Sequence, residues 1–175
     1  MGFSVRGMVV AGLFAGILCA AAPFSVFIGP VPLSFATLVI YLAAGALDMK
    51  SSVLSVVLYI LLGAIGLPVF SGFGGGFHKI VGVTGGFIIG YFPCAVAICA
   101  VLKAFGKKIW VYALGMLAGT FLLYACGTAW YVIQTGSPLA ASFALCVAPF
   151  LPGDAAKIVA ACIIAPRLRK ALART

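Results

Sequence analysis

The chain contains only two acidic residues, and one of them stands three positions before a lysine in an otherwise apolar stretch. That stretch covers residues 149–157, and its two charged residues are Asp154 and Lys157. A charge at the centre of a membrane costs about 2.5–3.5 kcal/mol on insertion scales, so two of them this close need a partner or a function. Positions i and i+3 share one face of a helix, so the side chains can neutralise each other. They can equally bind a polar solute, and the spacing leaves both interpretations open.

Residue types that would support other chemistry are scarce. The chain has one histidine and six cysteines, and no two cysteines form a Cys-x-x-Cys pair. We therefore predict no metal site, redox site or cofactor, and we interpret the cysteines as small apolar packing residues. The sequence also lacks a phosphate-binding loop and a nucleophile paired with a base, so neither ATP hydrolysis nor any other enzymatic activity is expected within this chain.

The composition is that of an integral membrane protein. Of the 175 residues, 65% are hydrophobic and 7% are charged, whereas soluble domains are about 45–50% apolar and about 25% charged. A hydrocarbon core of about 30 Å requires about 20 residues of helix, so the chain holds roughly six spans. We predict an all-α fold with six transmembrane helices in one membrane domain over residues 1–175, and no partner among nucleic acids.

Proline, glycine and charge divide the chain into helices. Residues 23–33 hold several prolines and glycines and are predicted to form a loop. The first segment also has the features of a signal peptide, but an uncleaved helix is expected, because the rest of the chain is embedded in the membrane. The predicted helices cover residues 5–22, 34–47, 51–66, 83–102, 109–133 and 152–166, with a short outer-side helix over 139–150.

A glycine-rich stretch, residues 67–86, interrupts the apolar segments and carries His78 and three phenylalanines. Irregular backbone at membrane depth survives only where it is buried in protein or lines a cavity, and glycine lets the backbone approach a ligand closely. We therefore predict that this stretch covers a ligand, with a surface turn as the other interpretation. His78 itself is expected to be a solvated loop residue rather than a ligand contact.

The positive charges predict the orientation. Cytoplasmic loops of membrane proteins collect lysine and arginine. With both termini in the cytoplasm, all of the 11 lysines and arginines except Lys79 and Lys157 fall on the inner side. This orientation places the 23–33 loop, the glycine-rich stretch and the Asp154/Lys157 pair on the outer side. We expect a multi-pass protein of the bacterial plasma membrane that meets its solute from outside.

Small residues of the first segment form two rows with a spacing of four. One row holds Gly7, Ala11, Ala15 and Cys19, and the other holds Gly12, Gly16 and Ala20. Such rows let another helix approach closely. Packing within this protein and docking of a partner membrane subunit are both open.

Four motifs follow one another along nearly the whole chain. They are Gly-Pro-Val-Pro-Leu-Ser-Phe-Ala-Thr-Leu from Gly29, Tyr-x-x-x-Gly-Ala-Ile-Gly-Leu-Pro-Val-Phe from Tyr59, Gly-Val-Thr-Gly-Gly-Phe-x-x-Gly-Tyr from Gly82, and Pro-Gly-Asp-x-x-Lys from Pro152. In this order they resemble BioY, the biotin-specific substrate-binding subunits (S-components) of energy-coupling-factor (ECF) transporters. The chain departs from that family at Ala36, where glutamine is usual, and at Val83, where proline is usual.

The resemblance implies an S-component fold with biotin bound near the outer face. It also implies a transmembrane coupling subunit and two cytoplasmic ATPase subunits as partners. In that family small residues of the first helix dock on the coupling subunit, and Ala11 and Ala15 match that pattern. The alternatives are an S-component for another small vitamin and a stand-alone biotin carrier without an ATPase module.

Biotin combines an apolar fused ring, a ureido group and a valerate carboxylate, so its site needs an apolar slot and a few polar groups. Asp154 can accept hydrogen bonds from the ureido N–H groups. Lys157 can donate to the ureido oxygen or pair with the carboxylate. The other interpretation is that Asp154 only caps the last helix and pairs with Lys157. Further contacts are expected from Tyr41, Phe73, Gly74, Gly75, Gly76, Phe77, Thr84 and Gly85.

Overall fold

The structure is a computed structural model that describes residues 4–27 and 31–174. Gly29 and Pro30, which open the first motif, lie outside the described residues. The helices are α1 (Val5–Ala21), α2 (Ala36–Ala46), α3 (Met49–Ala64), α4 (Phe77–Val81), α5 (Gly85–Phe105), α6 (Ile109–Thr135), α7 (Leu139–Cys146) and α8 (Leu151–Arg174). Two short strands, β1 (Ser25–Phe27) and β2 (Pro32–Ser34), pair antiparallel.

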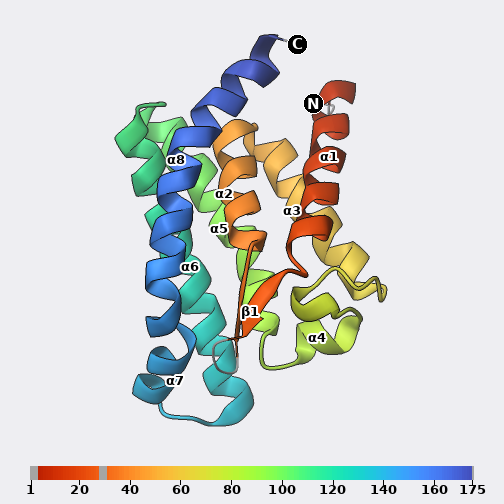
Figure 1. Ribbon diagram of the computed structural model, residues 1–175, viewed down its shortest axis with the longest axis vertical. Coiled ribbons are helices and arrows are strands. Elements are labelled where there is room, and N and C mark those ends of the chain that lie inside the picture. Colours follow the sequence, from red (N-terminus) through yellow and green to blue (C-terminus); the bar gives the residue numbers. More distant parts are fainter. Residues whose placement is uncertain (1–3, 28–30, 175) are drawn as a thin grey trace.

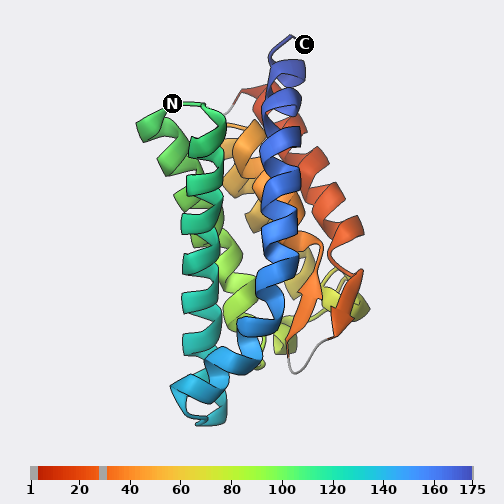
Figure 2. The same ribbon diagram turned by 60° about the vertical axis from the view of Figure 1, so that its left-hand side comes forward.

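The longer helices form an upright bundle (Figure 1). Both termini lie at one end of it, and the β1–β2 hairpin, α4 and α7 lie at the other end. Figure 2 shows α6 and α8 running side by side along the length of the molecule. The architecture is all-α apart from the hairpin, and it gives the protein one end built of helix termini and another built of loops and short elements.

Three stretches of the described residues are long and apolar enough to cross a membrane. They are Gly85–Phe105, Ile109–Thr135 and Leu139–Ala173. Helices α1, α2 and α3 are apolar but shorter. At a rise of 1.5 Å per residue, the 11 residues of α2 cover only about 16 Å, roughly half of a hydrocarbon core. Because α2 is so short, its first turn and the end of β2 lie well inside the bundle.

The second acidic residue, Asp48, begins α3. Its carboxylate accepts a hydrogen bond from the Ser51 backbone N–H at 3.2 Å and another from the Ser51 hydroxyl at 2.7 Å. Aspartate at this position satisfies a backbone donor that the helix itself leaves free. Asp48 therefore has a structural role in the turn between α2 and α3, at the end of the molecule that carries the termini.

Helices α5 and α6 share the most extensive contact among the described elements, and glycines permit part of it. A Cβ atom at Gly127 would collide with the Phe87 ring, and one at Gly86 would collide with the Trp130 side chain. Because glycine has no side chain, the two helix backbones can approach each other at these positions. The contact holds the first turns of α5 in a defined place against α6.

The observed elements differ from the predicted ones at four places. Within the segment predicted to be a loop, Ser25–Phe27 and Pro32–Ser34 form two paired strands, since proline excludes a helix there but is tolerated in a short edge strand. The helix predicted over 139–150 ends at Cys146 and is followed by a separate turn, Ala148–Phe150. The last helix continues past Pro166 to Arg174, because an interior proline removes one hydrogen bond without ending a helix whose other bonds remain. Residues 67–86 contain the turn Ser71–Phe73 and helix α4.

Candidate ligand-binding site

A cavity of about 370 Å³ lies between the hairpin, α4 and the bundle. This is the end of the molecule opposite the two termini (Figure 1). Pockets for small molecules are typically about 300–1,000 Å³, mostly apolar, with a few convergent polar groups. Its walls come from β2, α2, α3, α4, α5, α6 and α8. The volume and the mixed lining suit one small organic ligand.

Asp154 and Lys157 stand together in the wall of this cavity. Both are on the first turns of α8, and both are buried, with 4% and 9% of their surface exposed. Lys157 Nζ lies 2.9 Å from Asp154 Oδ1. The i, i+3 spacing places both side chains on the face of α8 that meets α2. Burial of this ion pair is expensive unless further polar partners surround it.

The lysine ammonium has three such partners. Lys157 Nζ donates to the Ser34 backbone oxygen at 2.8 Å, to Thr37 Oγ1 at 2.9 Å and to Asp154 Oδ1. An ammonium group has three donors, so all of them are engaged. The short α2 makes this arrangement possible, because it leaves the Ser34 carbonyl and the first helical turn at the depth of Lys157. A ligand acceptor can therefore reach Lys157 only by replacing one of these bonds.

The aspartate retains capacity for a ligand. Asp154 Oδ2 accepts a hydrogen bond of 2.5 Å from the Tyr124 hydroxyl, and Oδ1 accepts from Lys157 and, at 3.4 Å, from Thr37. An ionised carboxylate offers about four acceptor positions. Asp154 can thus take at least one further donor, and it lines the cavity where a ligand would lie. The Asp154 carboxylate is therefore a charged acceptor that side chains of α2, α6 and α8 hold in place.

Aromatic side chains form the apolar part of the wall. The rings of Tyr59 and Phe70 meet edge to face with centroids 5.6 Å apart, and Tyr59 also contacts Tyr91. A Cβ atom at Gly63 would occupy the position of the Phe70 ring. Because Gly63 has no side chain, Phe70 in the loop after α3 can pack its ring against α3. Together with Phe87 these rings form an apolar slot in the cavity wall beside the polar groups.

The predicted site residues divide into two groups. Asp154, Lys157 and Thr84 line the cavity. The others lie outside its lining: Tyr41, Phe73, Gly74, Gly75, Gly76, Phe77 and Gly85. Besides Thr84, the glycine-rich stretch contributes six other residues to the wall: Phe70, Ser71, His78, Lys79, Gly82 and Val83.

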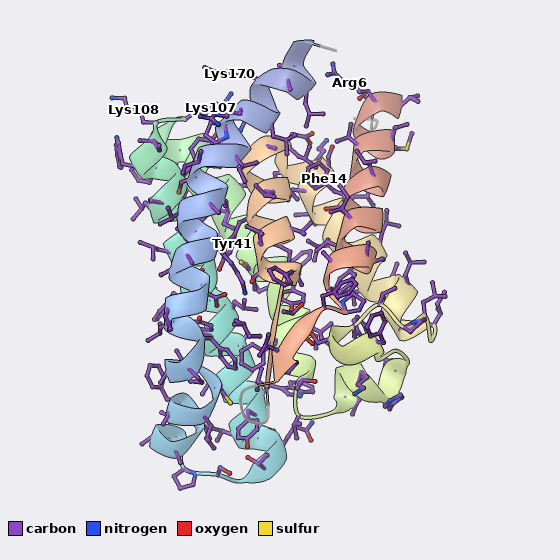
Figure 3. The ribbon with its side chains drawn as sticks, in the orientation of Figure 1. Arg6, Phe14, Tyr41, Lys107, Lys108 and Lys170 are labelled. Carbon is purple, nitrogen blue, oxygen red and sulfur yellow. The ribbon has the colours of Figure 1, made fainter. Side chains whose placement is uncertain are left out.

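Each excluded aromatic residue has a clear position. Tyr41 is fully buried near the middle of the bundle (Figure 3), and its hydroxyl lies 2.6 Å from Thr120 Oγ1. Phe73 is 61% exposed and packs its ring against Phe24, and Phe77 is 67% exposed. The stretch therefore lines the cavity with Phe70 and with polar side chains, and it turns Phe73 and Phe77 away. His78, which we expected to be a solvated loop residue, is exposed and also borders the cavity.

Thr37 and Tyr124 complete the site, and sequence reasoning missed both. Tyr124 lies in the middle of the 27-residue helix α6, far from the ends where membrane tyrosines usually sit. A tyrosine at mid-depth needs a partner for its hydroxyl, and this signal could have indicated it. Thr37 belongs to the first motif, but its residue type gives no comparable signal, because a threonine hydroxyl can bond to the backbone of its own helix.

The predicted docking residues Ala11 and Ala15 are buried. They are 0% and 3% exposed, so they offer no surface to another protein in this conformation. The second row, Gly12, Gly16 and Ala20, is exposed. A Cβ atom placed on either glycine would meet no atom within 4 Å. Helix α1 thus packs inside the protein with the row that contains Ala11 and Ala15, and the row of Gly12, Gly16 and Ala20 is accessible to a partner.

Comparisons with known proteins agree with one another. The BioY family model matches residues 1–174. The chain is 35% identical over 169 residues to the biotin transporter BioY of Thermotoga maritima, covering 95% of this chain and 97% of that protein. It is 41% identical over 157 residues to the probable biotin transporter BioY of Pyrococcus horikoshii, covering 90% and 92%. A crystal structure of the S-component for biotin from an ECF-type ABC transporter matches with a TM-score of 0.86 at 26% identity, covering 95% of this chain and 92% of that one.

Proposed function

The chain belongs to the BioY family, and we propose that it is the biotin-binding S-component of an ECF-type vitamin transporter. It is a membrane transport protein and not an enzyme. The observation that carries the proposal is the buried Asp154–Lys157 pair in the wall of a ligand-sized cavity. The likeness to the S-component for biotin supports the choice of vitamin.

The hydrogen bonds favour one orientation of biotin in the cavity. Asp154 retains acceptor capacity, so the ureido N–H groups belong beside it, with the fused ring in the slot of Tyr59, Phe70 and Phe87. Lys157 has no spare donor, which makes it a poor primary partner for the valerate carboxylate. Lys79 borders the cavity from α4 and is exposed. We therefore assign the carboxylate to Lys79, with His78 beside it.

This orientation predicts a selective effect at Lys79. Replacing Lys79 by glutamine should weaken the binding of biotin about threefold, because an exposed charge pair contributes about 0.2–1 kcal/mol. The neutral amide of biotin should bind the variant and the wild type equally, since it has no carboxylate to pair. Titration calorimetry with both ligands measures the difference. Lys107→Gln, at the other end of the molecule, is the control, and an equal loss for both ligands would contradict the assignment.

Tyr124 should hold the Asp154 carboxylate in position for the ureido group. Tyr124→Phe removes a hydrogen bond to a charged group, and such bonds contribute about 1.5–3 kcal/mol. We expect biotin to bind about tenfold more weakly, measured by the same calorimetry. Tyr112→Phe changes another buried tyrosine of α6 that does not line the cavity, and it should leave affinity unchanged. Unaltered affinity in Tyr124→Phe would remove Tyr124 from the site.

The distribution of charge supports an orientation with both termini in the cytoplasm. Arg6, Lys107, Lys108 and Lys170 gather at the end of the molecule where the chain begins and ends (Figure 3). Cytoplasmic surfaces of membrane proteins carry such an excess of lysine and arginine. The opposite end, with the cavity, then faces outward, so that biotin is captured from outside. We place the protein in the bacterial plasma membrane as a multi-pass protein.

Active uptake would require partners, because this chain has no phosphate-binding loop. We propose a transmembrane coupling subunit and two cytoplasmic ATPase subunits, with a stand-alone carrier as the alternative. The exposed row of Gly12, Gly16 and Ala20 on α1 is the surface that suits a close helix contact. Surrounding membrane lipid covers the other exposed apolar side chains.

Equilibrium binding to the detergent-purified protein tests the proposed function. The panel consists of biotin, dethiobiotin, thiamin and riboflavin. We expect biotin to bind at least about a thousandfold more tightly than thiamin or riboflavin, a difference of about 4 kcal/mol. Absence of biotin binding by a folded protein, or tighter binding of thiamin or riboflavin, would refute the assignment. Dethiobiotin reports how far the site distinguishes close analogues.

A further inference from the structure

A second hollow, of about 270 Å³, lies at the end of the molecule that carries the termini. It is bounded by the start of α1, the turn between α2 and α3, and the last turns of α8. It shares no lining residue with the biotin cavity. The proposed function assigns it no role.

Two arginines from different helices line this hollow. Arg6 comes from α1 and Arg169 from α8. Arg169 donates one hydrogen bond, to the Gly45 backbone oxygen at 3.3 Å, although a guanidinium has five N–H donors. Neither arginine forms an ion pair in the part of the chain that the structure describes. The hollow thus holds two cations with donors to spare.

The nearby carboxylate balances only one of the two arginine charges. Asp48 also borders the hollow, and both its oxygens accept hydrogen bonds from Ser51 at the start of α3. Counting Asp48, the charged side chains in the wall still leave one net positive charge. Guanidinium groups bind phosphate with paired N–H donors and give up their hydration more readily than an ammonium does. The chemistry of the hollow is therefore that of a site for a phosphate-bearing anion.

Helix α1, which carries Arg6, also has an exposed apolar row. Val5, Val9 and Leu13 are 73%, 66% and 58% exposed, and their spacing of four places them along one side of the helix, outside the lining of the hollow. Val10 and Leu172 contribute apolar surface to the hollow itself. A ligand with a phosphate and acyl chains would satisfy both features, whereas a free phosphate or an acidic side chain would use only the first.

We propose that this hollow binds the headgroup phosphate of an anionic phospholipid, with Arg6 and Arg169 as its two cationic contacts and the acyl chains along α1. Basic pockets between membrane helices on the cytoplasmic side attract such headgroups, with about 1 kcal/mol for each lysine or arginine near the surface. Lys107, Lys108 and Lys170 lie at the same end of the molecule (Figure 3) but outside the lining of the hollow. The inference rests on the membrane placement proposed above and is independent of which vitamin the protein binds.

Native mass spectrometry of the full chain, equilibrated with equal amounts of phosphatidylglycerol and phosphatidylcholine, tests this site. The wild type should retain phosphatidylglycerol in preference to phosphatidylcholine by about thirtyfold, as two arginine contacts of about 1 kcal/mol each imply. The double variant Arg6→Gln/Arg169→Gln should lose this preference. Lys107→Gln/Lys108→Gln removes the same charge at the same end outside the hollow and should keep it.

Other outcomes would overturn the proposal. Equal retention of the two lipids by the wild type, or an unchanged preference in the arginine variant, would show that the hollow binds no anionic lipid. Displacement of the lipid by millimolar inorganic phosphate would show a free-anion site instead. Loss of coupling-subunit binding in the arginine variant, with lipid preference intact, would assign the arginines to an acidic partner side chain. Biotin affinity, measured on the same samples, reports the proposed vitamin site separately and should be equal in all of them.

Discussion

Replacing Lys157 by alanine is expected to abolish measurable biotin binding and to destabilise the protein. The change leaves Asp154, which is 4% exposed, without its cationic partner. Removing one member of a buried ion pair costs about 3–5 kcal/mol, because the other charge stays buried without compensation. It also frees the Ser34 carbonyl and Thr37, which lose the donor that joins β2 and α2 to α8. We expect affinity to fall at least about a hundredfold, or about 2.7 kcal/mol.

A neutral double variant separates the two roles of the pair. Asp154→Asn/Lys157→Gln keeps hydrogen-bonding side chains at both positions and leaves no lone buried charge. Its thermal stability should recover most of what Lys157→Ala loses, but biotin binding should stay lost, because an amide is a weaker acceptor than a carboxylate. Wild-type affinity in a folded double variant would show that Asp154 only caps α8 and pairs with Lys157. Lys103→Ala, an exposed cation at the other end, should change neither quantity.

Replacing Gly85 by alanine is expected to weaken both the fold and biotin binding. A Cβ atom at this position would collide with the Ile80 carbonyl oxygen, so the turn from α4 to α5 would have to move. That turn cannot yield easily, because the Gly82 carbonyl accepts hydrogen bonds of 2.9 Å from both the Gly85 N–H and Trp130 Nε1. The same turn carries Thr84 into the cavity wall.

Overpacking of this kind costs about 1–3 kcal/mol, and displacement of the wall should lower biotin affinity at least about tenfold. Thermal unfolding and calorimetry of the purified variant measure the two effects. Gly12→Ala is the matched control, since a Cβ atom there meets nothing within 4 Å and should change stability by less than about 0.5 kcal/mol. If Gly85→Ala binds biotin as the wild type does, the turn is not a rigid part of the site.

The features that depend on local chemistry could be predicted from the sequence. The helix predicted over 109–133 is observed as Ile109–Thr135. Its ends could be predicted because lysines precede the apolar run and a polar turn follows it. The Asp154/Lys157 pair stood out because buried charges are rare and costly. The S-component fold that the resemblance implied is confirmed by the structural match.

Features that depend on which way a side chain turns could not be predicted. Phe73 and Phe77 are of a residue type that commonly lines a ligand slot. The local turns instead direct their rings outward and bring His78 and Lys79 to the cavity. Ala11 and Ala15 share their spacing with Gly12 and Gly16, and only the packing of α1 against α3 decides which row is buried. Tyr41 was expected to contact the ligand, but its hydroxyl forms a hydrogen bond with Thr120 of α6, a helix far from it in the sequence.

A crystal or cryo-electron microscopy structure of the protein saturated with biotin would test the proposed site most directly. We expect one biotin in the cavity between α8 and α4, with its ureido nitrogens within hydrogen-bonding distance of the Asp154 carboxylate and its valerate carboxylate toward Lys79. The three hydrogen bonds of Lys157 to Ser34, Thr37 and Asp154 should persist. Biotin bound with its carboxylate on Lys157, or an empty cavity with biotin elsewhere on the protein, would contradict this account.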